Sequence, residues 1–168
     1  MSVTTETVTT RRPATLTAAV AVTVVTAIAA VVNGIMIATG GLDLIKDVFA
    51  DAGLPGLTDE DIEGLALLAG HASLDDFVST FQTRGYLALV TGAALLVFGL
   101  VMVKAATWAR IMVTIAAALS IVFALVILAD ETTSTMALLA VVTMIASVVA
   151  IVLTWLPANG RYAKALRN

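Results

Sequence analysis

The chain has 168 residues and a net charge of −3; 60% of the residues are hydrophobic, only 12% are charged, and none is cysteine. Ordinary soluble domains carry about 25% charged residues, so this composition excludes a soluble domain and predicts a single-domain membrane protein. The lack of cysteine excludes disulfide bonds, thiolate metal sites and thiol catalysis.

The N-terminal part predicts a short tail and a first membrane span. Residues 1–13 are mostly polar and end in a double arginine and a proline, which is typical of a disordered cytoplasmic tail with a basic anchor. The chain then carries no charge until Asp43, and we expect a span over residues 16–38. A cleaved signal peptide ending near residues 27–29 is the alternative, although the apolar run is longer than the roughly 7 to 15 residues of such segments.

The segment 42–84, called the cap below, is acidic and predicts short helices on the outer side of the membrane. Apolar residues recur at helical spacing from Leu44 until a Gly-Leu-Pro-Gly sequence ends the first helix. Thr58 with Asp61 three residues later is close to a capping box, and Ser73 with Asp76 repeats the pattern, so two more helices are expected to begin there. The last of these helices can continue into the second span.

The second span, residues 85–103, is uncharged and just long enough to cross the hydrocarbon core of about 30 Å as a helix. Small residues form a narrow stripe along one face of this helix, which predicts a close helix neighbour, either within the bundle or in a homo-oligomer. The first span offers small residues of its own. The predicted packing residues of the two spans are Gly85, Ala88, Gly92, Gly99, Ala30 and Gly34.

Two further uncharged segments, 111–129 and 135–156, predict the third and fourth spans. A short turn separates the second span from the third, so these two form an antiparallel hairpin. Pro157 disfavours further helix, and residues 158–168 form a basic cytoplasmic tail. Aromatic and basic residues near the same ends of these spans are expected to anchor the protein at the membrane interface. These predicted anchors are Trp108, Arg110, Trp155 and Tyr162.

The charges predict the orientation. Seven of the nine basic residues lie in three short stretches near residues 11–12, 104–110 and 161–167, whereas eleven of the twelve acids lie in the cap or at residues 130–131. Basic loops stay in the cytoplasm, so four spans place every basic stretch inside and the acids outside. We therefore expect an all-α membrane protein with a four-helix bundle over residues 14–157, located in the plasma membrane with both termini in the cytoplasm.

Chemical motifs are weak. No Asp, Glu, Lys, Arg or His lies inside a span, which disfavours active transport. The acids from Asp59 to Glu63 resemble the start of a calcium-binding EF-hand loop, but Gly70 stands where the loop needs a glutamate, and a helix start explains them. A lone histidine without cysteine offers too few ligands for zinc. We expect no enzyme activity, no catalytic residue, no cofactor or metal site, and no binding of nucleic acid.

Four residues are candidates for contact with a ligand or partner: Asn33, Phe49, His71 and Phe77. Asn33 is the one amide within a span, and a helix-to-helix or helix-to-loop hydrogen bond is its structural interpretation. His71 in an acidic cap could instead sense mild acidification.

We expect a non-enzymatic accessory or scaffold subunit whose cap contacts a partner, embedded in membrane lipid as a homo-oligomer or part of a larger complex. The alternative is a binder of a small hydrophobic ligand or lipid, with a pocket under the cap near Asn33 and Phe77, or an oligomeric passive pore.

Two short motifs carry a family resemblance. The chain has Trp108-Ala109-Arg110 at the start of the third span and Leu156-Pro157-Ala158-Asn159 after the fourth. In these motifs, and in its Ala/Val/Thr-rich composition, it resembles small four-span integral membrane proteins of actinobacteria that have no assigned function. The chain departs from their pattern in Gly160 and Arg161, which precede the aromatic residue. The resemblance implies the fold and the membrane location, and no activity.

Overall fold

The structure is a computed structural model that describes residues 12–104, 107–130 and 132–165. Within these ranges every regular element is helical, and four of the helices are long and apolar enough to cross a membrane. The predicted fold class is therefore confirmed. The elements in chain order are α1 (Ala14–Asp51), α2 (Asp59–Leu68), α3 (Leu74–Val101), the 3-10 turn η1 (Met102–Lys104), α4 (Thr107–Ala129), α5 (Ser134–Thr154) and α6 (Pro157–Ala165).

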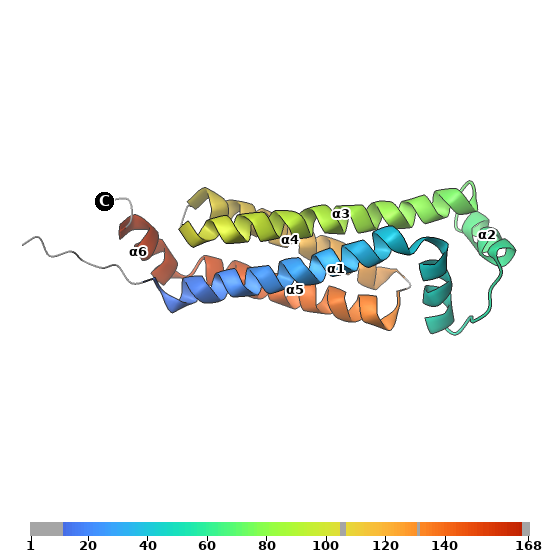
Figure 1. The fold of residues 1–168 in the computed structure, drawn as a ribbon, viewed down its shortest axis with the longest axis horizontal. Coiled ribbons are helices and arrows are strands. Elements are labelled where there is room, and N and C mark those ends of the chain that lie inside the picture. Colours follow the sequence, from blue (N-terminus) through green and yellow to red (C-terminus); the bar gives the residue numbers. More distant parts are fainter. Residues whose placement is uncertain (1–11, 105–106, 131, 166–168) are drawn as a thin grey trace, which may run out of the picture.

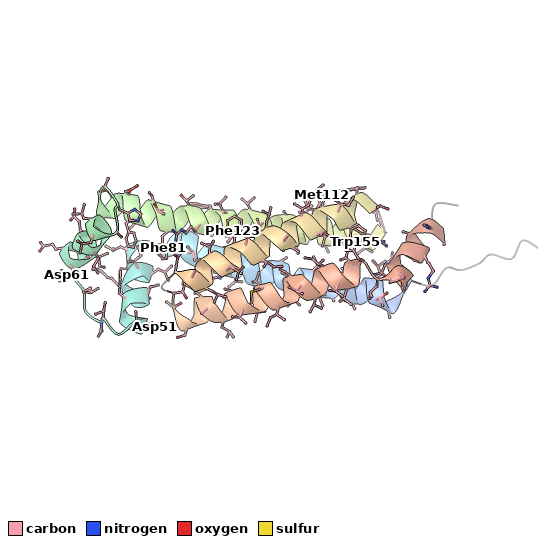
Figure 2. All side chains as sticks on the ribbon, turned by 180° about the vertical axis from the view of Figure 1, so that it is seen from behind. Asp51, Asp61, Phe81, Met112, Phe123 and Trp155 are labelled. Carbon is pink, nitrogen blue, oxygen red and sulfur yellow. The ribbon has the colours of Figure 1, made fainter. Side chains whose placement is uncertain are left out.

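The four long helices form an elongated bundle with α2 at one end and α6 at the other (Figure 1). Each long helix packs against two neighbours, so that α1 contacts α3 and α5, and α4 completes the ring between them. Phe81, Asp51 and Asp61 lie toward the cap end, and Trp155 lies toward the opposite end (Figure 2). Both ends of the described chain lie at the end opposite the cap, as an even number of spans requires.

The most extensive contact joins α1 and α3, and it depends on glycine. A Cβ atom at Gly85 would lie 2.5 Å from the backbone nitrogen of Ala38, and one at Gly34 would lie 2.7 Å from the backbone nitrogen of Leu89. The two backbones can approach this closely only because neither glycine carries a side chain. The predicted small-residue stripe thus lies buried against α1 inside the bundle, and is not available as a surface for homo-oligomerisation.

Helix α1 continues beyond the predicted span and bends at Gly41, which has φ 54° and ψ −143°. This conformation favours glycine because a side chain would clash with the backbone. Residues 42–51 therefore turn away from the bundle axis and lie across the cap end (Figure 1). The short cap helix predicted from Leu44 onward is present as this bent part of α1.

Both predicted helix starts in the cap are confirmed. The Thr58 hydroxyl accepts a hydrogen bond from the Asp61 backbone N–H, and the Asp61 carboxylate accepts one from the Thr58 backbone N–H, which completes a capping box. The Ser73 hydroxyl accepts a hydrogen bond from the Asp76 backbone N–H at the start of α3. Helix α3 then runs without a break from the cap into the second span.

The opposite end of the bundle differs from the sequence-based expectation. Pro157 does not end the helical structure; it occupies the first position of α6. Proline suits this position because its missing N–H has no partner in the first turn of a helix. Most of the expected basic tail is therefore helical. Residues 166–168, and residues 1–11 of the expected N-terminal tail, lie outside the described residues.

The bundle interior holds two hydrophobic clusters. The cluster near α6 includes Leu16, Leu95 and Val113, and the cluster near the cap includes Ile37 and Ile127. Between the clusters the buried residues are alanines, small polar residues and one amide. The outward faces of all four long helices carry exposed apolar side chains, as expected of a membrane-spanning protein.

Candidate functional site

A pocket of about 270 Å³ opens between the cap and the end of the bundle. The bent end of α1 and the first turns of α3 form its walls, with contributions from the loop before α3 and the residue after α4. It is called the cap pocket below. Nine residues line the cap pocket: Ile45, Val48, Phe49, His71, Phe77, Thr80, Phe81, Arg84 and Asp130.

Three of the four predicted contact residues meet in the cap pocket. Phe49 comes from α1, His71 from the loop between α2 and α3, and Phe77 from α3. All three are partly buried. The bend at Gly41 brings them together because it folds the end of α1 toward the start of α3.

Aromatic rings form a continuous row along one wall. The ring centroids of His71 and Phe77 lie 5.0 Å apart, and those of Phe77 and Phe81 lie 5.9 Å apart in an edge-to-face arrangement. The Arg84 guanidinium lies 5.9 Å from the Phe81 centroid, within the range of a cation–π interaction. Residues 77, 81 and 84 are spaced by four and three, so they share one face of α3.

The lining of the cap pocket includes an ion pair between Arg84 and Asp130, whose side chains are 38% and 32% exposed. Arg84 belongs to α3 and Asp130 directly follows α4, so the pair joins two spans where they enter the cap. Neither residue is among the site residues predicted from the sequence. A signal was available, because opposite charges at the same end of two antiparallel spans favour a pair.

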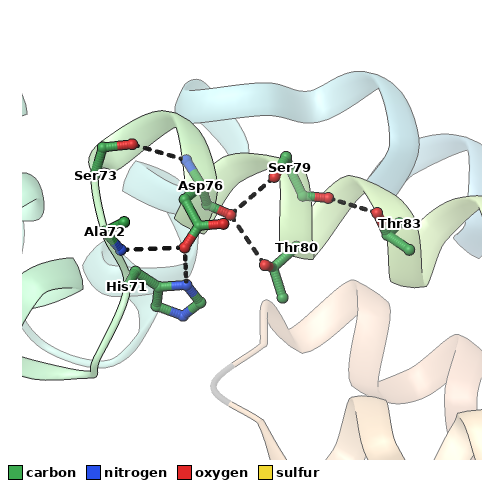
Figure 3. A network of polar contacts seen from close by, with 7 residues as sticks. All are labelled: His71, Ala72, Ser73, Asp76, Ser79, Thr80 and Thr83. Atoms are coloured by element: carbon green, nitrogen blue, oxygen red, sulfur yellow. Dashed lines mark hydrogen bonds and ion pairs between the residues drawn. The ribbon is translucent and has the colours of Figure 1, made fainter.

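A network of polar contacts surrounds His71, one of the residues that line the cap pocket (Figure 3). His71 Nδ1 lies 3.2 Å from Asp76 Oδ2, and the same oxygen accepts a hydrogen bond of 3.2 Å from the Ala72 backbone N–H. The Thr80 hydroxyl donates to the Asp76 carbonyl at 2.9 Å. This hydroxyl is therefore engaged with the helix backbone.

The bent end of α1 is tied to its surroundings by side-chain contacts. The Ser134 backbone N–H donates to Asp51 Oδ2 at 3.0 Å, so α1 supplies a carboxylate to the start of α5. Lys46 Nζ lies 2.7 Å from Asp59 Oδ1 at the start of α2. The wall that carries Phe49 is thus held from two sides.

Asn33 does not line the cap pocket, contrary to the expectation of a pocket near Asn33 and Phe77. It is buried in the bundle, and its Nδ2 atom donates a long hydrogen bond of 3.4 Å to the Met136 carbonyl. This contact agrees with the structural interpretation of the amide. Asn33 lies eight positions before the bend at Gly41, which corresponds to about 12 Å along the helix axis.

The four expected interfacial anchors fall into two groups. Trp108 and Trp155 are about half exposed, at 53% and 52%. Arg110 and Tyr162 are instead buried inside the protein, at 5% and 8%. An anchor at the membrane interface needs an exposed polar end, so the burial of these two residues assigns them to packing at the α6 end of the bundle.

The α6 end also contains a buried polar residue, Asn159, that is not among the site residues predicted from the sequence. Asn159 is fully buried; its Oδ1 accepts a hydrogen bond of 2.7 Å from Thr15 Oγ1, and its Nδ2 donates one of 2.8 Å to the Leu153 carbonyl. The Asn159 carbonyl accepts a hydrogen bond from the Arg110 guanidinium. The two motifs that carry the family resemblance therefore contact each other.

The cap pocket combines an apolar wall, an ion pair and a histidine, which suits a small molecule with one apolar and one polar part. Among the described residues, no group of three His, Asp or Glu side chains could hold a metal ion. No protein-family model, curated protein or solved structure matches the chain. The fold alone therefore defines the class: this is a multi-pass membrane protein with a four-helix bundle and a helical cap.

Proposed function

We propose that this integral membrane protein is a non-enzymatic binder of a small hydrophobic or amphiphilic molecule, which it takes into the cap pocket. The observation that carries the proposal is the convergence of Phe49, His71 and Phe77, from three different segments, on one pocket. Ligand pockets measure about 300 to 1,000 Å³, so a volume of about 270 Å³ suits a small ligand or one part of a larger lipid.

The chemistry of the lining supports an amphiphilic ligand. Aromatic and aliphatic side chains would cover its apolar part, and burial of apolar surface would supply most of the affinity. Arg84 and Asp130 already pair with each other, so the polar part would meet a neutral pair and not an isolated charge. A neutral or zwitterionic polar group fits this pair better than a single charge does.

The proposal places the cap on the outer side of the plasma membrane, where a ligand could enter from the outer leaflet or from outside the cell. The segregation of basic and acidic residues supports this orientation. The Trp-Ala-Arg and Leu-Pro-Ala-Asn motifs support kinship with the small four-span actinobacterial membrane proteins. Surrounding membrane lipid is the only other partner that this function requires.

An accessory role, in which the cap contacts a protein partner, is the second candidate. Exposed leucines on the cap favour it: Leu68 on α2 is 86% exposed, Leu67 is 54% exposed, and Leu54 is 50% exposed. Large apolar side chains this exposed on an acidic cap are typical of surfaces that another molecule covers. These leucines do not line the cap pocket, so the two candidates can be separated by mutation.

Two substitutions test the proposal. Thr80→Trp would fill the cap pocket without adding charge, and Leu68→Asp would alter the exposed face of α2 without touching the pocket. Both variants would be purified from native membranes in mild detergent. Small molecules bound to the protein would be identified by mass spectrometry of organic extracts, and co-purified proteins by peptide mass spectrometry.

If the proposal is right, a small molecule accompanies the wild type and Leu68→Asp and is reduced at least about tenfold in Thr80→Trp, which corresponds to about 1.4 kcal/mol of lost affinity. If the accessory role is right, a protein partner is lost from Leu68→Asp and retained by Thr80→Trp. Equal recovery of every small molecule with wild type and Thr80→Trp would refute the binding function.

A further inference from the structure

A much smaller cavity of about 10 Å³ lies in the middle of the bundle, beside the hydrophobic cluster near the cap. Each of the four long helices contributes one alanine to its lining, which leaves space at the centre. Each also contributes one small polar residue. These are Asn33 from α1, Thr91 from α3, Ser120 from α4 and Thr143 from α5.

Two of these polar residues have atoms without a hydrogen-bond partner. Asn33 is 3% exposed and its Oδ1 accepts no hydrogen bond; Thr143 is 4% exposed and its Oγ1 neither donates nor accepts one. Both residues line the cavity. Buried polar atoms in folded proteins almost always have a partner, and in the membrane no lipid atom can supply a donor for Asn33 Oδ1.

The other two polar residues have spare acceptor capacity. The Ser120 hydroxyl donates to the Ala116 carbonyl at 2.9 Å, and the Thr91 hydroxyl donates to the Leu87 and Ala88 carbonyls, each at 3.0 Å. Each hydroxyl oxygen still has lone pairs that can accept a hydrogen bond. The lining therefore offers the Thr143 hydroxyl as a donor without a partner, together with several acceptors.

We propose that this cavity holds a single structural water molecule that bridges Asn33 Oδ1 and Thr143 Oγ1 at the centre of the four spans. The volume matches one water, which needs roughly 10 to 15 Å³ of accessible space and two to four polar partners. The water donates one hydrogen bond to Asn33 Oδ1 and a second to the hydroxyl oxygen of Ser120 or Thr91. Its oxygen accepts a hydrogen bond from the Thr143 hydroxyl.

A metal cation fits the cavity less well than water does. The polar residues of the lining are all neutral, so a cation would bring an uncompensated charge into the membrane interior. Water supplies a donor for Asn33 Oδ1 and an acceptor for the Thr143 hydroxyl, and it brings no charge.

The direct test is a structure of the full chain in lipid nanodiscs, at about 2 Å resolution, where ordered water is visible. The expected result is a single density peak within about 2.6 to 3.2 Å of both Asn33 Oδ1 and Thr143 Oγ1. The same peak should be absent in Thr143→Val, which keeps the shape of the side chain and removes the hydroxyl. It should persist in Ser147→Ala, the matched control, because Ser147 is also buried with an unpartnered hydroxyl but does not line the cavity.

A wild-type structure with well-ordered neighbouring side chains and no peak would overturn the proposal, whether or not Thr143→Val folds. A second measurement distinguishes water from a cation. The thermal unfolding midpoint should be the same in sodium chloride and in choline chloride of equal ionic strength. A midpoint that rises only with sodium would overturn the assignment of water.

Discussion

Single glycine residues decide how closely the two longest helices approach. Gly34 and Gly85 face each other across the α1–α3 contact, and a Cβ atom at Gly34 would lie 2.9 Å from the Gly85 carbonyl oxygen. Apolar helices gain little by leaving lipid of equal polarity, so close backbone packing supplies much of their association free energy. The free energy of helix association in the bundle therefore depends on the lack of a Cβ atom at these two glycines.

We expect Gly85→Ala to destabilise the bundle, because the new methyl group would meet the backbone of α1 at 2.5 Å and backbone atoms cannot move aside singly. Such overpacking costs about 1 to 3 kcal/mol. Gly64→Ala in α2 is the matched control, since no atom lies within 4 Å of its new methyl group, and alanine should favour the helix by about 0.5 to 1 kcal/mol. The free energy of unfolding of each variant can be measured in mixed detergent micelles. Equal stability of Gly85→Ala and wild type would contradict the close α1–α3 contact.

At the scale of single elements, the sequence predicts best what depends on neighbouring residues. The helix starts at Thr58 and Ser73 are correct because a cap and its partner lie three residues apart in the chain. The start of α6 at Pro157 was not predicted, because proline is compatible both with a helix end before it and with a first helical position. In the structure Pro157 is the first residue of a helix, and this helix is held by a hydrogen bond between Asn159 and Arg110, which lie far apart in the sequence.

The capping box makes the stability of α2 depend on pH. Hydrogen bonds from the Thr58 hydroxyl and then from its backbone N–H lower the pKa of Asp61. The folded pKa therefore lies below the unfolded value of about 3.9. The stabilisation is complete above that unfolded value and is lost as the pH falls through the folded pKa.

We therefore expect the protection of α2 amides against hydrogen exchange, relative to the intrinsic rate at each pH, to fall between pH 5 and pH 3. Asp61→Ala should show low protection at both values, because alanine has no oxygen that can accept the hydrogen bond from the Thr58 backbone N–H. Glu63→Gln, a substitution of an exposed acid on the same helix outside the capping box, should behave like the wild type. Undiminished protection of wild-type α2 at pH 3 would contradict the role of Asp61.

The whole molecule separates its charges from its membrane-spanning interior, and this separation explains what the sequence could predict. Charge-free segments of span length specify the four long helices without any knowledge of their packing. The meeting of Arg84 with Asp130, and the burial of Asn33 below the cap pocket, depend on how the helices rotate about their axes. Periodicity in apolar segments does not determine that rotation, because lipid-facing and core-facing residues are equally hydrophobic.

The same separation predicts which ends of the bundle share a compartment. We expect Glu63→Cys, on exposed α2, to react with a membrane-impermeant maleimide in intact cells. Lys164→Cys, on the exposed face of α6, should react only after the membrane is permeabilised. The wild-type chain has no cysteine and provides an unlabelled background.

The physical reason for this expectation is that basic segments resist transfer across the membrane during insertion, whereas acidic ones contribute little to orientation. Labelling of both variants in intact cells would mean that the cap and α6 lie on the same side, which a four-span bundle with its cap and α6 at opposite ends does not permit.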